Sequence, residues 1–449
     1  MENIFKKYQE EYLNDLFGLL RIDSVRVEQP TIKEAPFGYG CVKALEYVLD
    51  LGARMGFKVK NVDNVAGHIE FGEGEEILGI LCHLDVVPVG EGWTNPPFEP
   101  ILKDGKIYAR GSNDDKGPLM SALYAMKILK DQGFKPNKRI RLIIGTDEET
   151  ASRGLKRYLE VESEPTIGFS PDADFPLIYG EKGIMSIDIL DENENKDIIS
   201  ITAGDRYNVV PEKATALIKK DVTDNYEKYM QENNYSGGSG KNGKRVRLGM
   251  NGKRAHAMEP RNGENAMLRL FNFLKDYTSS NLIKFVADSL NDSRFKDIGL
   301  DYTNAEMGDL TCNVAVCDID SKKGKVGINL RYPINWEKEE FLEKFASIAS
   351  NYNLKIKVLD DSNPHYIDPN SNLVKKLHEA YVDVTGDKVN NIMTIGGGTY
   401  ARLLKNAVAY GASLPGRETV AHMVDEYMSL IDLETACLVS ISALEKLGW

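Results

Sequence analysis

The sequence predicts an α/β protein in which a mostly parallel-sheet domain is interrupted by an inserted α+β domain. Before about residue 180, short apolar runs alternate with segments of helical apolar spacing, which is typical of a parallel sheet covered by helices. Strand-like runs dominate after Gly183, and helical character returns after about Tyr366. Because a chain of 449 residues exceeds what one core usually supports, we predict a discontinuous domain at 1–182 and 367–449 and an inserted domain at 183–366.

Apolar periodicity locates the main elements of the discontinuous domain. In Val42–Met55 the apolar residues recur near every 3.6 positions, which predicts a helix. Short Ile/Leu-rich runs predict buried strands, and longer periodic segments predict helices. On this basis we expect strands at Glu76–Cys82 and Arg139–Ile144, and helices at Gly117–Leu129, Leu373–Val384 and Leu433–Leu447.

The inserted domain has a different texture. Ile184–Ile189 and Thr215–Lys220 are typical of strands, and a long polar stretch follows at Asp221–Lys244. The basic stretch Lys241–Arg247 lies beside the Gly/Ser-rich run at 236–240, and this composition predicts a flexible, solvated loop.

Composition excludes several classes of function. The formal net charge of −12 argues against nucleic acid or anionic membranes as partners, because both bind through Lys/Arg clusters. Charged residues interrupt the first twenty positions, so no secretory apolar core is expected there, and no run reaches the ~18 apolar residues that span a bilayer. Five scattered cysteines without a CxxC pair argue against a disulfide framework. We therefore expect a cytoplasmic protein.

Histidine and acidic residues gather where predicted strands end. His83 and Asp85 lie two residues apart, so both side chains point to one side of a strand end, where the carboxylate can orient the imidazole ring. A single His-x-Asp is more often structural. Its significance depends on what the neighbouring strand ends carry.

Three further acidic clusters follow in the same domain. Asp114 and Asp115 come after a glycine turn, and Asp147-Glu148-Glu149 follows an apolar strand, where like charges need a compensating cation. Asp172 follows another short apolar segment. Each cluster alone is compatible with a solvated loop. Together they predict a site, because ligands of open α/β sheets gather beyond the carboxyl ends of the strands.

The ordered series of motifs resembles the aminoacylase and dipeptidase V family (carnosinase-like) of co-catalytic metallopeptidases. The motifs are His83-Leu-Asp85, Asn113-Asp-Asp-Lys-Gly117, Asp147-Glu-Glu149, Pro171-Asp-Ala-Asp-Phe-Pro176 and Ala421-His-Met-Val-Asp-Glu426. The resemblance implies two divalent ions per chain, held by His83, Asp172, Glu149 and His422, with Asp114 as the bridging ligand and Asp85 orienting His83. Asp115 remains the alternative to Asp114 as the bridge.

The resemblance also implies a metal-bridging hydroxide as nucleophile. Three carboxylates and that hydroxide balance the charge of two divalent ions. Nitrogen and oxygen ligands without thiolate suit zinc, and also manganese or cobalt. Glu148 takes the role of general base, and no Gly-x-Ser-x-Gly elbow is present for a serine nucleophile.

Residues outside the metal motifs are assigned by the same resemblance. The resemblance implies that the inserted domain is a lid over the catalytic domain. It also implies that His256 stabilises the oxyanion and that Asn208 and Arg331 bind substrate. Arg331 is also compatible with an ordinary surface charge. The glycines Gly396, Gly397 and Gly398 are predicted to offer backbone N–H groups to a substrate carboxylate at a helix start, or else to form a simple turn.

The predicted function is hydrolysis of dipeptides with a free N-terminus, with β-Ala-His and Xaa-His types among the candidate substrates. An N-acyl amino acid deacylase is the alternative enzyme, since it uses the same metal machinery. A non-catalytic metal-binding scaffold is the alternative of another class, against which the presence of Glu148 argues. A lid of this size predicts an active monomer, with His256 acting in its own chain.

Overall fold

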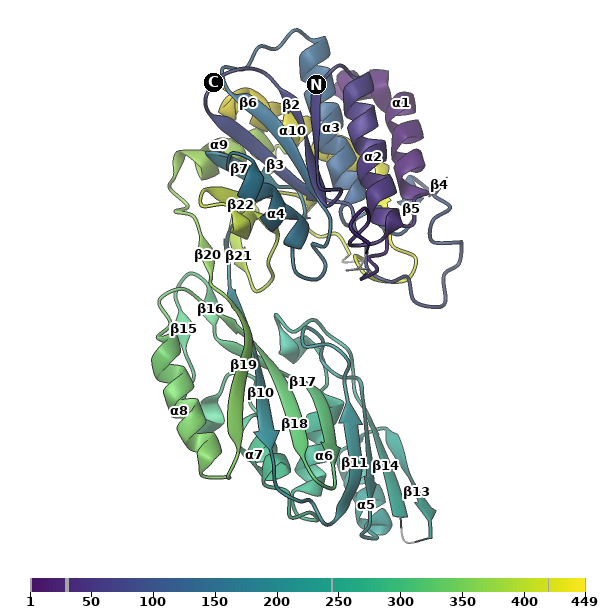
Figure 1. Cartoon of the computed structure of the whole chain (residues 1–449), viewed down its shortest axis with the longest axis vertical. Helices are drawn as coiled ribbons and strands as arrows, with labels where there is room; N and C mark the ends of the chain where they lie inside the picture. The colour runs from purple at the N-terminus through teal and green to yellow at the C-terminus, as the bar shows by residue number, and fades with distance from the viewer. Residues whose placement is uncertain (1, 29–31, 244, 419, 449) are drawn as a thin grey trace. The chain divides into compact units, whose positions relative to one another are not determined.

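The computed structural model describes residues 2–28, 32–243, 245–418 and 420–448. The chain forms two compact units (Figure 1). Unit 1 comprises residues 1–180, 367–393 and 398–449, and unit 2 comprises residues 181–366 and 394–397. Within the described ranges, no helix has the length and apolar character needed to cross a membrane.

Unit 1 alternates strands and helices along the sequence. Its helices are α1 (Glu2–Leu20), α2 (Tyr39–Arg54), α3 (Lys116–Asp131), α4 (Arg153–Val161), α9 (Asn372–Thr385), η3 (Tyr400–Leu403) and α10 (Leu430–Leu447). Its strands are β1 (Lys58–Val62), β2 (Ala66–Phe71), β3 (Ile77–His83), β4 (Ile101–Lys103), β5 (Lys106–Tyr108), β6 (Arg139–Gly145), β7 (Ile167–Ser170), β8 (Ala173–Asp174), β22 (Ala407–Ala409), β23 (Ala412–Ser413) and β24 (Tyr427–Ser429). Three short strands lie at the unit boundaries in the sequence: β9 (Ile178–Glu181), β20 (His365–Tyr366) and β21 (Met393–Ile395).

The main sheet of unit 1 has a parallel centre. In the described chain its strand order is β1-β2-β6-β3-β7-β22-β9-β20, and β21 pairs with β9. The pairs β6–β3, β3–β7 and β7–β22 are parallel, whereas β1 and β2 extend the sheet in antiparallel fashion. His83 pairs with Gly145, and Ile80 with Phe169. The carboxyl ends of β6, β3 and β7 therefore meet at one edge.

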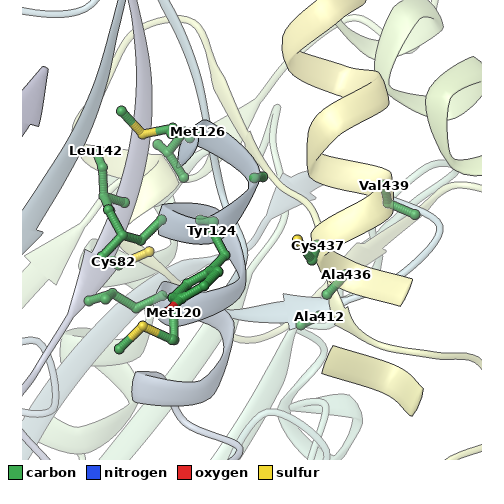
Figure 2. Packing of buried hydrophobic residues seen from close by; sticks show 14 of the residues in the cluster. Cys82, Met120, Tyr124, Met126, Leu142, Ala412, Ala436, Cys437 and Val439 are labelled. Carbon is green, nitrogen blue, oxygen red and sulfur yellow. The ribbon is translucent and has the colours of Figure 1, made fainter. Parts of the chain in front are cut away.

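Successive apolar side chains of the buried strands belong to two separate apolar clusters, one on each face of the sheet. Cys82 of β3, Leu142 of β6 and Tyr124 of α3 belong to one large cluster (Figure 2). Residues of α1, α2, α9 and α10 complete it. Their neighbours Leu81 and Ile143 join a second cluster with residues of α4 and η3. Because successive side chains of a strand point to opposite faces, the sheet is packed on both sides. Helix α3 is buried along most of its length, and each large apolar side chain removed from water contributes roughly 1.5–3 kcal/mol.

Unit 2 is built on an antiparallel sheet. Its strands are β10 (Gly183–Asp191), β11 (Ile198–Ala203), β12 (Lys213–Ile218), β13 (Gly237–Asn242), β14 (Arg245–Asn251), β15 (Thr303–Asn304), β16 (Gly308–Asp309), β17 (Thr311–Asp320), β18 (Gly324–Tyr332) and β19 (Lys355–Ser362). Its helices are α5 (Thr223–Glu232), η1 (Pro260–Asn262), α6 (Ala266–Leu274), α7 (Asn281–Ser289), η2 (Lys296–Ile298) and α8 (Lys338–Ser350). The sheet order is β13-β14-β12-β11-β17-β18-β10-β19, and helices α5, α6, α7 and α8 contribute to its apolar core.

The expected loop around the Gly/Ser-rich run is wrong. Residues 237–242 form β13, which pairs along its whole length with β14 at the edge of the sheet. Val246, Leu248 and Met250 of β14 are buried, so the apolar alternation of β14 holds the hairpin in register. Glycine lowers strand propensity, but backbone pairing with an anchored neighbour outweighs that preference here.

The predicted α/β class is confirmed, and the parallel arrangement is limited to the centre of the large sheet. The predicted helix at 42–55 corresponds to α2, and the helix at 117–129 to α3. The predicted strands at 76–82 and 139–144 correspond to β3 and β6. The inserted segment forms a mixed unit of antiparallel strands and helices, in agreement with the predicted α+β character.

His68 of β2 provides a pH test of the stability of unit 1. Its side chain is buried, and its Nδ1 accepts from the Tyr158 hydroxyl at 2.7 Å while Arg141 donates to that hydroxyl at 3.0 Å. Burial, aided by the positive charge of Arg141, lowers the pKa of His68 from 6.5 to about 4. Between these values the unfolded chain binds more protons, so the stability associated with neutral His68 is present above pH 6.5 and is lost toward pH 4.

We expect His68→Gln to remove this part of the pH dependence, because glutamine accepts the same hydrogen bond without titrating. Between pH 7.5 and pH 5 the free energy of unfolding of the wild type should fall by about 2 kcal/mol more than that of the variant. Denaturant unfolding of both proteins at the two pH values measures this difference. Parallel pH profiles would contradict the assignment.

Candidate metal centre

The predicted metal ligands of unit 1 come together at the carboxyl edge of its sheet. His83 ends β3, Glu149 follows β6, and Asp172 lies between β7 and β8. Asp114 lies in the loop between β5 and α3, and His422 lies between β23 and β24. Five segments that are distant in the sequence thus supply one cluster, because the parallel strands end at the same edge.

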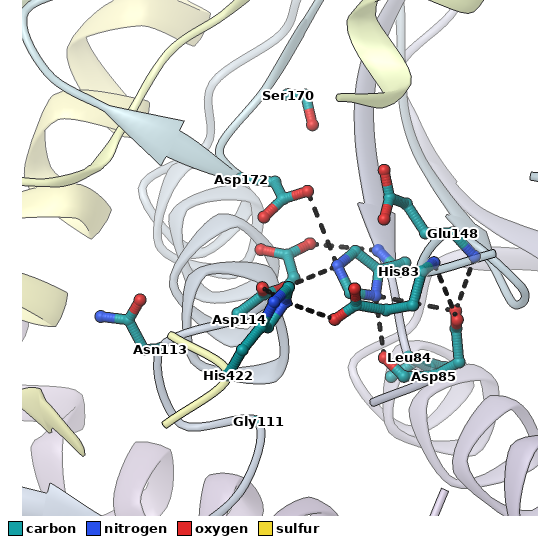
Figure 3. Close-up of polar contacts among 12 residues, drawn as sticks. His83, Leu84, Asp85, Gly111, Asn113, Asp114, Glu148, Ser170, Asp172 and His422 are labelled. Atoms are coloured by element: carbon teal, nitrogen blue, oxygen red, sulfur yellow. Dashed lines mark hydrogen bonds and ion pairs between the residues drawn. The ribbon is translucent and has the colours of Figure 1, made fainter. Parts of the chain in front are cut away.

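Asp114 lies at the centre of the cluster (Figure 3). Its Oδ1 is 2.8 Å from His83 Nε2, and its Oδ2 is 2.8 Å from His422 Nε2. The same His422 nitrogen is 2.8 Å from Glu149 Oε1, and His83 Nε2 is 3.6 Å from Asp172 Oδ2. One carboxylate therefore contacts two imidazoles, and each imidazole also faces a second carboxylate.

Asp85 contacts both sides of the cluster. Its backbone carbonyl accepts from His83 Nδ1 at 2.9 Å, whereas its carboxylate lies 3.6 Å from that nitrogen. The carboxylate instead accepts the backbone N–H groups of Glu148 and Glu149 at 3.0 and 3.2 Å. The bond to Nδ1 leaves Nε2 of His83 directed at Asp114, as a ligand nitrogen requires. The contact that orients the His83 ring is thus made by the main-chain carbonyl of Asp85. The Asp85 side chain instead holds the backbone of Glu148 and Glu149.

The acidic groups of the cluster are buried together and interact strongly. Burial raises the pKa of Asp172 and Glu149, and the charge of Asp114 raises both further. Burial also raises the pKa of Glu148, and Glu149 and Asp114 add to the effect. Burial would raise the pKa of Asp114 too, but the contacts with His422 and His83 outweigh it and hold that pKa below its usual range. The cluster therefore concentrates negative charge that needs a cation.

The carboxylates of the cluster act on the pKa of the two histidines. Burial would lower the pKa of His422, but Asp114 and Glu149 raise it to about 11, and Asp114, Asp172 and Asp85 likewise raise that of His83. In the described part of the chain, Asp114, Glu149 and Asp172 form ion pairs with these histidines and with no lysine or arginine. This is a setting that a metal ion fits, because imidazole and carboxylate are its usual protein donors.

The donor atoms also converge closely enough to hold ions. The ligand atoms of His83, Asp114 and Glu149 lie within 4.8 Å of one another, and so do those of His83, Glu148 and Asp172. Two overlapping groups of three share His83. The set contains oxygen and nitrogen donors without thiolate, which suits zinc, manganese or cobalt.

Asp115 has different contacts from Asp114. Its Oδ2 accepts the backbone N–H of His83 at 3.0 Å, and its side chain is fully buried. Burial, together with the charge of Asp114, raises its pKa to about 7. Asp115 thus holds the strand end that carries His83, while Asp114 faces the imidazoles.

Asp147 departs from the expectation that all three acids of its motif need a metal. Arg153 contacts its carboxylate at 2.8 and 3.1 Å, and Arg26 forms a close ion pair with it. Arg26 is distant in the sequence, so the acidic motif alone gave no sign of this partner. Asp147 therefore anchors the turn that presents Glu148 and Glu149.

The remaining predicted site residues belong mostly to unit 2. Arg331, on β18, is buried, and it donates to Asn329 Oδ1 at 2.8 Å and to the Gly396 carbonyl at 2.9 Å. The alternative of an ordinary surface charge is therefore wrong for Arg331. His256 is exposed, its Nδ1 accepts from the backbone N–H of Met258 at 3.1 Å, and the main chain beside Asn208 pairs with it through the Val209–His256 bridge.

The triple glycine is divided between the units, with Gly396 and Gly397 in unit 2 and Gly398 in unit 1. A Cβ on Gly396 would lie 2.9 Å from Met258, so a side chain there would collide with the segment that follows His256. The helix expected after these glycines is the four-residue η3, with Thr399 as its cap. Such a short turn has little helix dipole to offer a carboxylate.

Comparison with known proteins identifies the group to which this cluster belongs. Residues 79–446 match the model of Peptidase family M20/M25/M40. The chain belongs to this family. It is therefore a hydrolase of the metallopeptidase class, and peptides are its substrates.

Two kinds of relative agree with this membership. A protein of Staphylococcus aureus (strain MRSA252), named as a putative dipeptidase, is 41% identical over 460 residues, which cover 98% of both chains. The solved structures of the dipeptidase Dug1p from Saccharomyces cerevisiae and of human carnosine dipeptidase 1 both align with TM-score 0.61. They are 13% and 14% identical, and the alignments cover 99% of this chain and 97% and 98% of theirs. At such identities the structural likeness shows a shared fold.

Proposed function

We propose that this M20 peptidase is a dinuclear, zinc-dependent dipeptidase that acts on short peptides with a free N-terminus. The observation that carries the proposal is Asp114, a single carboxylate whose two oxygens contact two different imidazoles. Such an arrangement suits a ligand shared by two ions, with His83 and Asp172 beside one and His422 and Glu149 beside the other. The dipeptidase names of the staphylococcal, yeast and human relatives support the substrate class.

The chemistry follows from the residues of the cluster. When bound, two divalent ions would lower the pKa of a water molecule and polarise the substrate carbonyl. Glu148 is the proposed general base, which accepts the proton of the attacking water at its carboxylate and returns it to the leaving amine. Asp85 assists by holding the backbone N–H groups of Glu148 and Glu149, which fixes the direction of the base.

We further propose that unit 1 is the catalytic domain and that the inserted segment is a lid. The resemblance supports an oxyanion-stabilising role for His256 and substrate-binding roles for Asn208, Arg331 and the glycines 396–398. Arg331 is held on two sides by Asn329 and the Gly396 carbonyl, so its guanidinium has a defined direction before any substrate arrives.

A substrate panel tests the proposed class. The zinc-loaded protein should hydrolyse Ala-Ala and β-Ala-His at least about 100-fold faster than N-acetylalanine, because a site that recognises a free amine rejects analogues that lack it. Dialysis against a chelator should abolish turnover, and zinc should restore it. Faster hydrolysis of N-acetylalanine would identify a deacylase instead, and chelator-resistant activity would contradict the metal mechanism.

The proposed monomer can be tested by mixing two inactive variants. If His256 acts within its own chain, a mixture of Glu148→Ala and His256→Ala chains should remain as inactive as each variant alone. Recovery of activity on mixing would show that subunits share sites. We also propose a cytoplasmic location without nucleic acid or membrane partners, which the acidic charge and the five buried free cysteines support.

A further inference from the structure

Glu426 is a fully buried carboxylate four residues beyond His422, and the proposed chemistry gives it no role. Its Oε1 accepts three backbone N–H groups of one loop, those of Gly111 at 3.0 Å, Asn113 at 2.9 Å and Asp114 at 3.2 Å. This loop carries Asp114 toward the imidazoles. A side chain of the His422 segment thus holds the backbone of the Asp114 segment directly.

Arg110 completes the arrangement from the other side. Its guanidinium is buried, and it donates to Glu426 Oε2 at 2.5 Å and to the Met423 carbonyl at 3.2 Å. A longer contact of 3.4 Å reaches the Pro88 carbonyl, in the segment that follows Asp85. The indole ring of Trp93 lies 5.1 Å from the guanidinium carbon. Three loops that carry metal-centre residues therefore meet at one buried ion pair.

The main chain supports the same junction. The Glu426 carbonyl accepts from Ala109 at 3.1 Å, and the next residue, Tyr427, pairs with Tyr108 in the β24–β5 ladder. His422 has a φ of 65°, in the left-handed region that non-glycine residues adopt when their surroundings hold them. The end of the His422 loop is thus held both by Glu426 and by β24, which begins at the next residue.

We propose that Glu426, with Arg110, is a positioning residue that sets the spacing between Asp114 and His422 and so tunes the affinity of the metal centre. The proposal rests on the metal assignment made above. Glu426 touches neither ion nor substrate; it acts through the backbone of the Asp114 loop. His83 and Asp172 lie on other strand ends, so the effect should fall mainly on the ion beside His422 and Glu149.

Glu426→Gln tests this role, because the amide keeps the size of the side chain but removes the charge that pairs with Arg110. Arg110→Lys is a second variant, which keeps the charge but loses the forked contacts with Met423 and Pro88. The matched control is Glu70→Gln. Glu70 is also buried and accepts from Arg141 at 2.6 and 2.8 Å, but this pair joins β2 to β6 and, among the described residues, contacts no metal-centre loop. All three substitutions weaken one buried Arg–Glu pair.

The readouts are zinc stoichiometry, zinc dissociation constants from chelator competition, and the visible spectrum of the cobalt-loaded protein. We expect Glu426→Gln and Arg110→Lys to weaken one zinc site by about 10–100-fold, as loss of an outer partner of a ligand does, and to shift the cobalt spectrum. Glu70→Gln should lower the melting temperature without changing zinc affinity or spectrum.

Wild-type affinity and spectrum in both Glu426→Gln and Arg110→Lys would overturn the proposal. The same loss of zinc affinity in Glu70→Gln would also overturn it, since the effect would then be general destabilisation. Failure of the wild-type protein itself to bind two ions would refute the dinuclear assignment, and the comparison between variants separates that result from a failure of the positioning role.

Discussion

Glu148→Gln is expected to retain its metal ions and to lose most of its turnover. Glutamine keeps the size of the side chain and the backbone N–H that bonds to Asp85, but its amide cannot accept a proton from water. General acid–base residues contribute about 10²–10⁴-fold, so kcat should fall by that factor with KM little changed. Steady-state hydrolysis of Ala-Ala, combined with zinc analysis of the same sample, measures both quantities.

The control for this variant is Glu160→Gln on α4. Glu160 is exposed and pairs only with Arg157 in the described ranges, so its substitution should leave kcat and zinc content at wild-type values. A zinc-loaded Glu148→Gln enzyme with a kcat close to that of the wild type would refute the general-base role. Loss of zinc from that variant would instead indicate that Glu148 is a ligand beside His83 and Asp172.

The strand ends explain why the cluster could be predicted without a structure. Apolar runs before His83, Asp147 and Asp172 identify buried strands, and parallel strands present their carboxyl ends at one edge. The positions of these three segments at one edge of the sheet can therefore be predicted from the local sequence. The acidic pair at Asp114 and Asp115, after a glycine turn, adds a fourth segment. The fifth, around His422, carries no such signal, and only the resemblance to a family of known chemistry placed it.

Long-range contacts explain what could not be predicted. Asp147 pairs with the distant Arg26 as well as with Arg153, and Glu426 pairs with Arg110. The Asp147–Arg26 and Glu426–Arg110 pairs follow no local spacing rule. The β13–β14 hairpin could not be predicted from the local sequence either, because β13 forms by pairing with β14, whose alternate residues are buried, and its own glycines do not favour a strand. In each case the deciding interaction joins segments whose proximity is a property of the fold.

Substitution of Asp114, the proposed shared ligand, is expected to cause a large loss of metal affinity, whereas the same substitution of Asp115 is not. Asp114 contacts His83 and His422 through separate oxygens, whereas Asp115 accepts from the His83 backbone N–H. Asp114→Asn keeps only one oxygen donor, so it should lose the ligand to one of the two ions and the negative charge that holds both. Removing an outer partner of a ligand typically costs 10–100-fold in affinity, so loss of a bridging ligand should exceed about 100-fold.

Asp115→Asn is the matched variant, because it changes an adjacent residue in the same way. Its amide oxygen can still accept the His83 N–H, so we expect it to keep both ions through dialysis and to retain measurable turnover. Zinc analysis of the two proteins after identical dialysis decides between the residues, and circular dichroism checks that both are folded. If Asp115→Asn loses its zinc while Asp114→Asn keeps it, Asp115 is the ligand shared by the two ions. The contacts of Asp114 with the two histidines would then exist only in the metal-free protein.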